Sequence, residues 1–295
     1  MKLIGFLNLG NTCYINSVLQ CFIYDQLFQK TLDESNILYD IIKHIDLTDN
    51  EENLNIPYNL KRFIDYFISK KNWFKRYEQN DAHEFLTNFI DLLCNPIQGS
   101  NPLDKSAESL WNCFLKNNDS PITEVYHGQL RTTVKCCKCN NCSINYEEFN
   151  TINLNVTGDG KITDLFMEYL RKESINDYYC NNCKCEHESE KKTSLYRIPD
   201  RLIIVLKKYS TKYKVQLGNL SIKEPINGII KRYSLTGIIN HSGNLHDGHY
   251  TTNVLINNNW YFTDDNNIYL NDSILLDDPD AYILFYNLSP SPFTK

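Results

Sequence analysis

The sequence lacks several features that would place it in whole classes of protein. None of its stretches approaches the ~18 consecutive apolar residues of a membrane-spanning helix. Its first residues hold a single Lys and no apolar core followed by a small-residue cleavage site, so we expect no signal peptide. Internal repeats and long low-complexity linkers are absent, and a net charge of −6 argues against a nucleic-acid-binding surface. These absences favour a globular chain without a membrane or nucleic-acid partner.

The composition is that of a folded protein, with 42% hydrophobic and 22% charged residues. A length of 295 residues allows one large domain or two ordinary ones. Eleven cysteines in a chain without a secretory signal indicate a reducing compartment, which we expect to be the cytoplasm or the nucleus. We therefore expect catalytic or metal-binding cysteines rather than disulfides.

Near the N-terminus, a glycine-containing loop runs into an amphipathic helix. One helical face is formed by apolar residues at i, i+3, i+4 and i+7, namely Ile15, Val18, Leu19 and Phe22. Asn11 and Thr12 are N-cap types, so Cys13 falls in the first helical turn. Unpaired N–H groups and the helix dipole favour a thiolate there, which makes Cys13 a candidate nucleophile. The alternative is that Cys13 is a small buried apolar residue.

The rest of the N-terminal third is predicted to be helical. Apolar residues at helical spacing predict helices over 36–45 and 58–70, and the acidic stretch from 46 to 55 is expected to be a surface loop. Apolar residues at positions 82, 85, 86, 89, 90 and 93 predict a further helix, with Asp81 as its N-cap.

From residue 125 onward the pattern becomes that of strands. Residues 125–134 are rich in strand formers, and the apolar residues at 152, 154 and 156 alternate strictly. A short helix is expected over 163–171. Further strands are predicted over 202–206, 233–240, 249–256, 259–263 and 281–286, with Asn257-Asn258-Asn259 as a hairpin connection.

Two clusters of C-x-x-C pairs, about forty residues apart, predict a zinc site. In the first cluster both Cys136–Cys139 and Cys139–Cys142 are valid pairs, whereas the second cluster offers Cys180–Cys183. Four thiolates from two turns form a tetrahedral site without an open position, so this zinc would be structural. The alternative is a set of free thiols in a finger whose metal site has decayed.

A second candidate catalytic stretch lies near the C-terminus. His249 begins a predicted strand, and Asp264 ends the next strand, so antiparallel pairing could place the two side by side. The Asp would then hold one ring nitrogen and leave the other facing a thiol. Asp265 is either a second orienting acid or an exposed residue, and His241 and His246 are expected to shape the loop before His249.

Together these motifs resemble those of the ubiquitin-specific proteases. The segment 5–20 is similar to the Cys box of that family, and the segments 248–250 and 260–265 are similar to its His box. The resemblance covers nearly the entire chain, including the helix that follows Gln79, the cysteine finger and residues 198–207. Departures are small: Asn80 replaces a usual Gln, and Lys207-Lys208-Tyr209 replaces a Leu-Lys-Arg-Phe-like run.

The resemblance implies an α+β fold with a papain-like cysteine protease core, arranged as thumb, palm and fingers with a zinc-ribbon finger. It implies one catalytic domain over 1–295, with a helical thumb over about 1–118, fingers over 119–198 and a β palm over 199–295. Cys13 is then the nucleophile, His249 the general base and Asp264 the residue that orients His249, with Asp265 in a secondary catalytic role. Asn8 would donate to the oxyanion, and its alternative role is to brace the loop.

The resemblance also selects one set of zinc ligands, Cys136, Cys139, Cys180 and Cys183, and implies no cofactor for catalysis. Asp81 and Glu84 are implied to bind basic residues of the C-terminal tail of ubiquitin, although each could equally be a helix cap or a solvated charge. Gly248 and Tyr250 are expected to contact the same tail. Residues 244–247 and 212–219 would flank its channel.

The sequence therefore predicts a deubiquitinating thiol isopeptidase that cleaves after the C-terminal Gly of ubiquitin in protein or polyubiquitin substrates. Ubiquitin and ubiquitinated proteins would be its partners, and we expect a monomer. The alternatives are a protease for another ubiquitin-like modifier, a catalytically silent ubiquitin-binding module and, more distantly, a nucleic-acid-binding zinc protein.

Overall fold

The computed structural model describes residues 2–32, 38–39, 56–94, 96–97, 99–208, 211–224, 228–244 and 248–289. The chain forms two compact units. The first unit combines residues 1–93 with 235–286, and the second combines residues 94–234 with 287–295. The predicted thumb, finger and palm boundaries divide the chain differently and stay a prediction. The helix predicted over 36–45 and the loop over 46–55 fall almost entirely outside the described residues.

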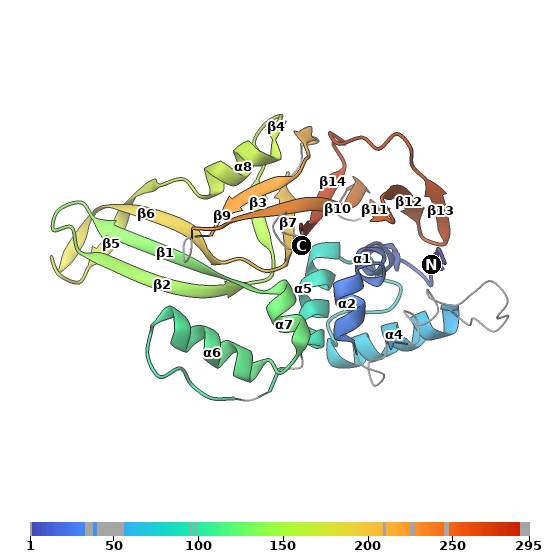
Figure 1. Ribbon diagram of the computed structural model, residues 1–295, viewed down its shortest axis with the longest axis horizontal. Helices are drawn as coiled ribbons and strands as arrows, with labels where there is room; N and C mark the ends of the chain where they lie inside the picture. Colours follow the sequence, from blue (N-terminus) through green and yellow to red (C-terminus); the bar gives the residue numbers. More distant parts are fainter. Residues whose placement is uncertain are drawn as a thin grey trace. The chain divides into compact units, whose positions relative to one another are not determined.

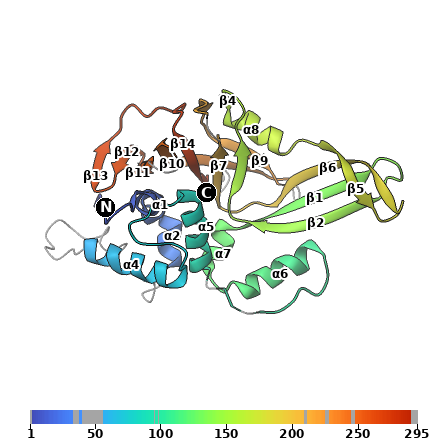
Figure 2. The same ribbon diagram turned by 180° about the vertical axis from the view of Figure 1, so that it is seen from behind.

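The first unit joins the N-terminal helices to the last strands of the chain. Its helices are α1 (Cys13–Ile23), α2 (Gln26–Thr31), α4 (Ile56–Lys70) and α5 (Ala82–Leu93). Its strands are β10 (Ile230–Gly243, from residue 235 onward), β11 (Gly248–Ile256), β12 (Asn259–Asp264), β13 (Asn267–Leu270) and β14 (Ala281–Leu288, up to residue 286). Both views show α2, α4 and α5 gathered around α1 (Figures 1 and 2).

The helices of the first unit follow the predicted periodicity. All four residues of the predicted face of α1 are buried, as are the six apolar positions of α5. Asp81 caps α5 as predicted, because its Oδ1 accepts hydrogen bonds from the backbone N–H groups of His83 (2.7 Å) and Glu84 (3.1 Å). Thr12 occupies the N-cap position of α1, but its side chain does not cap the helix. Instead its Oγ1 accepts from the N–H of Leu9 at 3.0 Å.

The strands of the first unit form a sheet in the order β13-β12-β11-β10-β14. β11 pairs antiparallel with both β10 and β12. The β11–β12 hairpin turns through Asn257 and Asn258, whose φ angles of 49° and 65° are in the left-handed region that Asn tolerates. The predicted asparagine connection is therefore confirmed, and the turn returns β12 along β11 toward the start of that strand.

The second unit contains the remaining elements. Its helices are α6 (Ala107–Asn117), α7 (Pro121–Tyr126) and α8 (Ile162–Tyr169). Its strands are β1 (Gly128–Cys136), β2 (Cys142–Phe149), β3 (Ile152–Asn155), β4 (Gly160–Lys161), β5 (Glu173–Cys180), β6 (Cys185–Arg197), β7 (Arg201–Lys207), β8 (Val215–Gln216) and β9 (Leu220–Lys223), followed by the first part of β10.

One predicted strand boundary in the second unit is wrong. Val125 and Tyr126 end α7 rather than begin a strand, and β1 starts only at Gly128. The helix begins here because Pro121 at the first turn has a preset φ, while the Ser120 hydroxyl caps the N–H of Ile122 at 3.3 Å. Local helix-start chemistry thus outweighs the strand propensity of the two residues.

Long antiparallel strands dominate the second unit, in the order β2-β1-β6-β5. β3 pairs in parallel with β7 and alternates between buried and exposed residues, as predicted. The apolar run from Leu202 to Leu206 is buried throughout, which confirms a strand covered on both faces.

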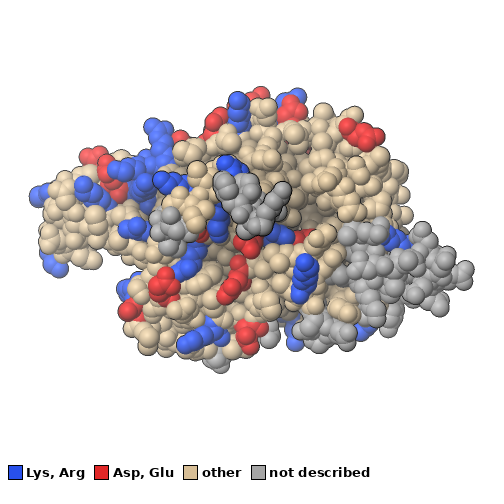
Figure 3. Space-filling view, in the orientation of Figure 1, with Lys and Arg blue, Asp and Glu red and all other residues tan. Residues whose placement is uncertain are grey.

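The charge of residues 128–197, the segment that contains the four-stranded sheet, is balanced. Figure 3 shows blue Lys and Arg side chains over β1, β5 and β6 on the face drawn. Over residues 128–197, however, ten Lys and Arg are matched by ten Asp and Glu. Ion pairs join several of them, including Lys172–Glu190 at 3.0 Å and Lys191–Glu173 at 2.8 Å. The segment thus has no net positive charge. No helix among the described residues is long and apolar enough to cross a membrane.

An aromatic cluster anchors α1 in the core of the first unit. The ring of Phe22 packs edge to face against Phe28, Phe89 and Phe285, at centroid distances of 5.0, 5.1 and 5.7 Å. Phe22 is 1% exposed. One side chain therefore connects α1 to α2, α5 and β14.

We predict that Phe22→Ala lowers the free energy of unfolding by about 3–5 kcal/mol, because it leaves a cavity among three packed rings. Denaturant unfolding measures this loss. Tyr66→Ala is the control, since Tyr66 is 40% exposed on α4 and its removal should cost less than about 1 kcal/mol. Equal losses for the two variants would contradict the central position of Phe22.

Candidate active site

The thiol of Cys13 lies at the start of α1 and is buried, with 5% of the residue exposed. Burial raises its pKa above the ordinary value of 9.0, and the nearby Asp265 carboxylate raises it further. Hydrogen bonds from the backbone N–H groups of Tyr250, Tyr14 and Cys13 itself oppose this shift without cancelling it. Burial of the thiol thus acts against the predicted preference for thiolate, because desolvation opposes the donors of the helix terminus.

His249 and Asp264 are brought together by the β11–β12 hairpin, as predicted. The His249 Nε2 and Asp264 Oδ1 atoms are 2.7 Å apart, and both side chains are about two-fifths exposed. This contact leaves Nδ1 as the ring nitrogen available to a thiol. Tyr250, the residue after His249, donates its N–H to Cys13 Sγ, so β11 brings the backbone that follows His249 into contact with the thiol. Among the described residues, no hydrogen bond yet joins Cys13 Sγ to the His249 ring.

Asp265 connects two asparagines from the N-terminal segment. Its Oδ2 accepts from Asn8 Nδ2 at 2.9 Å, and its Oδ1 accepts from Asn16 Nδ2 at 2.8 Å. The backbone of Asp265 is left-handed, with φ at 50°, which turns its carboxylate away from the line of β12 toward these amides. One oxygen of Asp265 also lies within 4.8 Å of ligand atoms of His249 and Asp264. Asp265 is thus part of the site rather than a solvated charge.

Asn8 braces the loop that precedes α1. Its Oδ1 accepts from the backbone N–H groups of Gly10 (3.0 Å) and Thr12 (3.2 Å). Since an amide nitrogen carries two protons, the donation to Asp265 leaves a second proton for another acceptor. Bracing of the loop and donation to an oxyanion are therefore compatible.

β11 is fixed against α1 by a buried hydrogen bond. Thr252, fully buried in β11, donates its hydroxyl to the carbonyl oxygen of Ser17 at 3.0 Å. On the same helix, Gln20 Nε2 donates to the carbonyl oxygen of Ile4 at 2.8 Å. α1 is thus bonded both to β11, which carries His249, and to the N-terminal segment, which carries Asn8.

Asp81 is engaged inside the first unit. Besides capping α5, it accepts a hydrogen bond from the hydroxyl of Tyr282, 2.8 Å from Oδ2 and 3.1 Å from Oδ1. The hydroxyl of Tyr250 accepts from the N–H of Ala82. Glu84 is exposed in the first turn of α5. These contacts join the start of α5 to β11 and β14, and the binding of a substrate tail by Asp81, Glu84 and Tyr250 stays a prediction.

Gly248 sits where a side chain would not fit. An added Cβ would lie 2.0 Å from Nε2 of His241, whose ring stacks on Tyr250 at a centroid distance of 4.5 Å. The N–H of Gly248 donates to Gln79 Oε1 at 3.2 Å. The His241 ring therefore packs against the residues on either side of His249, and its expected role in shaping the loop stays a prediction. β10 continues past His241 to Gly243. His246 lies outside the described residues, as do Leu245 and Asp247.

Three residues of this site were not predicted from the sequence to be functional: Asn16, Gln79 and Tyr282. Asn16 carried a usable signal, because it is a polar residue inside an apolar helix, and it proves to be 2% exposed. Gln79 belongs to a motif of the family resemblance but had no assigned role. Tyr282 had no signal, since a tyrosine in a predicted strand is ordinary.

The four predicted zinc ligands converge in the second unit. The Sγ–Sγ distances are 4.0 Å for Cys136–Cys183 and 3.6 Å for Cys139–Cys180, and all four sulfurs lie within 4.8 Å of one another. Zn–S bonds of about 2.3 Å in a tetrahedron place sulfurs about 3.8 Å apart, so the donor set fits Zn²⁺. Cys142 is exposed and its thiol donates to the carbonyl oxygen of Asn140 instead, which excludes the alternative pair.

The two cysteine turns share one backbone design. Asn140 and Lys184, each the residue after the second cysteine of a pair, have φ angles of 57° and 58°. Their N–H groups donate to the carbonyl oxygens of the first cysteines, Cys136 at 2.9 Å and Cys180 at 2.8 Å. Each pair is therefore held in a tight turn at the tip of a hairpin, either β1–β2 or β5–β6.

Comparison with solved structures confirms the predicted fold class. The SAGA Ubp8/Sgf11/Sus1/Sgf73 DUB module bound to ubiquitin aldehyde matches with a TM-score of 0.77 and 20% identity, over 97% of this chain and 70% of that chain. A structure of the same module bound to monoubiquitin matches with a TM-score of 0.78 and 20% identity, over 97% and 69% of the two chains. At this identity the likeness establishes the fold alone.

Comparison by sequence gives relatives of one kind. Ubiquitin carboxyl-terminal hydrolase 2 of Bos taurus is 27% identical over 98% of this chain and 56% of its own length. Ubiquitin carboxyl-terminal hydrolase 21 of Rattus norvegicus is 24% identical over 98% and 62%. The chain thus spans somewhat more than half the length of these relatives. Because the family model described as "Ubiquitin carboxyl-terminal hydrolase" matches residues 4–286, the chain belongs to that family.

Proposed function

We propose that this protein is a thiol isopeptidase that cleaves after the C-terminal Gly of ubiquitin on protein or polyubiquitin substrates. The observation that carries the proposal is the His249–Asp264 pair, whose Nε2 and Oδ1 atoms are 2.7 Å apart. His249 lies on β11, and the next residue of that strand, Tyr250, donates its N–H to Cys13 Sγ. Family membership and the relatives named as ubiquitin hydrolases support the choice of ubiquitin. The chemistry follows from the residues in place.

The first half of the reaction forms a thioester. As the substrate carbonyl enters, Nδ1 of His249 takes the proton of Cys13 Sγ, and the sulfur attacks the carbonyl carbon. The resulting oxyanion is held by the Asn8 amide and by backbone N–H groups at the start of α1. When the C–N bond breaks, the His249 imidazolium gives its proton to the leaving lysine amine. Asp264 holds the ring in orientation and stabilises its charged form.

The second half returns the free enzyme. A water molecule loses a proton to Nδ1 of His249 while its oxygen attacks the thioester carbonyl. Breaking of the C–S bond releases the C-terminal carboxylate of ubiquitin, and the sulfur of Cys13 recovers a proton from the ring. Since burial raises the pKa of Cys13, the thiol needs a base to remove its proton, and we assign that role to His249.

The side chains around Gly248 suit a glycine-terminated tail. The close approach of His241 leaves no room for a side chain at position 248. We assign to this crowded segment the contact with a substrate tail that has no side chains there. Asp81 and Glu84 supply the carboxylates that we assign to basic residues of the tail. Residues 212–219 and 244–247 are proposed to flank the channel. A modifier with a different tail would be hydrolysed more slowly, which separates ubiquitin from ubiquitin-like alternatives.

We also propose that Cys136, Cys139, Cys180 and Cys183 hold one structural Zn²⁺. The fit of the four sulfurs and the matched turns support it. When bound, the metal would fasten the ends of two hairpins that otherwise share only the β1–β6 pairing, and it would take no part in the reaction. We further propose a monomeric protein of the cytoplasm or nucleus, with ubiquitin and ubiquitinated proteins as partners.

Hydrolysis of a C-terminal fluorogenic ubiquitin tests the proposed reaction. Cys13→Ala is expected to abolish turnover, and Asp264→Asn to lower kcat by about 10²–10⁴-fold with little change in KM, because the ring loses its orientation. Asp272→Asn, an exposed acid of the same unit, serves as the control. Ubiquitin binding without turnover by the wild type would instead identify a silent binding module.

Alkylation of Cys13 by iodoacetamide, followed by peptide mass spectrometry, tests its protonation state. A raised pKa keeps the thiol protonated at neutral pH, so the rate should keep rising with pH beyond 9.0. Asp265→Asn removes a repulsive charge and should shift the profile to lower pH. The Asp272→Asn profile should match that of the wild type. A plateau well below pH 9.0 in the wild type would show that the free protein already holds a thiolate.

Metal analysis of two cysteine variants tests the zinc proposal. The wild type and Cys142→Ser should each contain about one zinc per chain, whereas Cys180→Ser should lose it. Chelation should lower the Tm of the wild type, since the metal contributes to folding. Zinc retained in Cys180→Ser, or lost in Cys142→Ser, would overturn the assigned ligand set.

A further inference from the structure

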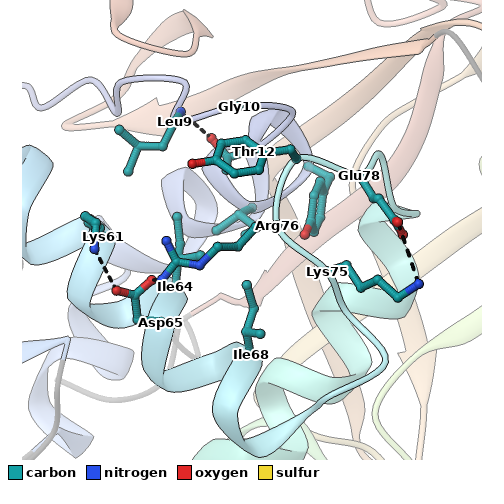
Figure 4. A pocket seen from close by; sticks show the side chains of 13 residues that line it. Leu9, Gly10, Thr12, Lys61, Ile64, Asp65, Ile68, Lys75, Arg76 and Glu78 are labelled. Carbon is teal, nitrogen blue, oxygen red and sulfur yellow. Dashed lines mark hydrogen bonds and ion pairs between the residues drawn. The ribbon is translucent and has the colours of Figure 1, made fainter.

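A cavity of about 170 Å³ lies in the first unit beside the catalytic helix (Figure 4). Its walls come from the loop that precedes α1 and the first turn of that helix, from α4 and from residues 75–78. Neither Cys13 nor His249 lines it. Since an apolar cavity of about 150 Å³ can bind benzene, this one has room for a single ring-sized molecule.

The deep wall of the cavity is apolar. Ile15 and Ile64 are 1% and 6% exposed, and Ile68 lies one turn further along α4. Figure 4 shows the side chains of Ile64 and Ile68 on the α4 side, with Leu9 across from them. A ligand that fills this space must therefore present an apolar body.

The charged residues of the cavity do not balance. Three cations and two carboxylates line it, namely Lys61, Lys75 and Arg76 with Asp65 and Glu78. Asp65 accepts from Lys61 at 2.8 Å and from Nη2 of Arg76, and Lys75 is 3.7 Å from Glu78. One positive charge is in excess, and the Arg76 guanidinium has further N–H donors to offer. A ligand with one negative charge would complete the balance.

The cavity wall includes the loop that carries the catalytic groups. Gly10 and Thr12 line it, and their N–H groups hold the side chain of Asn8. Tyr77 also lines the cavity, and its ring covers Gly10, where an added Cβ would lie 2.4 Å from the Tyr77 ring. Asn11 Nδ2 donates to the carbonyl oxygen of Tyr77 at 2.6 Å.

The contact between these two segments includes one uncommon backbone conformation. Gly10, Asn11 and Tyr77 have φ angles of 104°, 54° and 65°, and a left-handed tyrosine is uncommon. Tyr77 is 69% exposed, so burial does not impose its conformation. An occupant of the cavity would thus touch the segment directly before the nucleophile and also Tyr77, whose left-handed backbone is unfavourable for its residue type.

We propose that this cavity binds a small monoanion with one apolar ring, of the aromatic carboxylate class, and that its occupancy changes the reactivity of Cys13 through the loop. The ring occupies the isoleucine wall, and the carboxylate binds Arg76. Gly248 and Asp81, which we assign to the ubiquitin tail, do not line the cavity, so we expect the ligand to act without competing with the tail.

Calorimetric titration with benzoate, and with neutral benzamide as its isostere, tests the binding. Benzoate should bind the wild type saturably with a Kd of about 1 mM or below. Benzamide should bind about tenfold more weakly, as should benzoate to Arg76→Gln, because each change removes one charge. Ile68→Trp should fill the cavity and abolish binding. Arg62→Gln, a charge loss on α4 outside the cavity, should leave the Kd unchanged.

The benzoate titration does not depend on the proposed enzyme activity, because it uses no ubiquitin substrate. Absence of saturable benzoate binding to the folded wild type would overturn the proposal. Equal affinity for benzoate and benzamide would overturn the charge assignment, and binding retained by Ile68→Trp would place the ligand elsewhere.

The coupling is tested by the rate at which iodoacetamide alkylates Cys13, which requires no ubiquitin. Saturating benzoate should change this rate at least about twofold in the wild type and in Arg62→Gln, and leave it unchanged in Ile68→Trp. An unchanged rate in benzoate-saturated wild type would overturn the link between the cavity and the nucleophile.

Discussion

The packing of β11 against α1 is the constraint on which the site depends. α1 carries Cys13 on its first turn, and β11 carries His249, although the two residues lie at opposite ends of the sequence. The buried Thr252–Ser17 hydrogen bond and the Tyr250 N–H donated to Cys13 Sγ join the two elements. The same burial that assembles the site raises the pKa of Cys13 by desolvation. The burial that assembles the site and the burial that raises the pKa of the thiol are therefore the same. A thiol with a raised pKa needs a base to take its proton before it can attack.

Around this contact, short polar side chains hold the loop before α1. Asp265 binds Asn8 on one oxygen and Asn16 on the other, and Asn8 in turn binds the N–H groups of Gly10 and Thr12. Hydrogen bonds thus position residues 8–12 of the loop, whereas the buried Phe6 anchors its start, and Leu9, Gly10 and Thr12 border a cavity. Such a loop responds to small changes in its partners, because each hydrogen bond contributes only about 1 kcal/mol.

The cysteine cluster lies in a part of the second unit where little apolar surface is buried. The long strands β5 and β6 expose many of their residues, so little apolar burial stabilises the hairpin ends. Two matched turns bring four sulfurs to zinc-compatible distances, so a metal can replace a core there. Over residues 128–197 the cations are matched by as many carboxylates, so this segment carries no net positive charge.

Sequence by itself determined the local elements and the reactive residues. The periodicity of α1 and α5, the alternation in β3, the cysteine spacing and the pairing of His249 with Asp264 all follow from rules that act over a few residues or between adjacent strands. Only the tertiary structure decided the burial that raises the pKa of Cys13, the place of Asp265 and the contacts of Asn16 and Tyr282. The Asn16–Asp265 bond joins residues 249 positions apart, and the pKa of a thiol depends on everything that excludes water from it. Neither this hydrogen bond nor this pKa can be predicted from a local sequence pattern, since both arise only when distant segments pack.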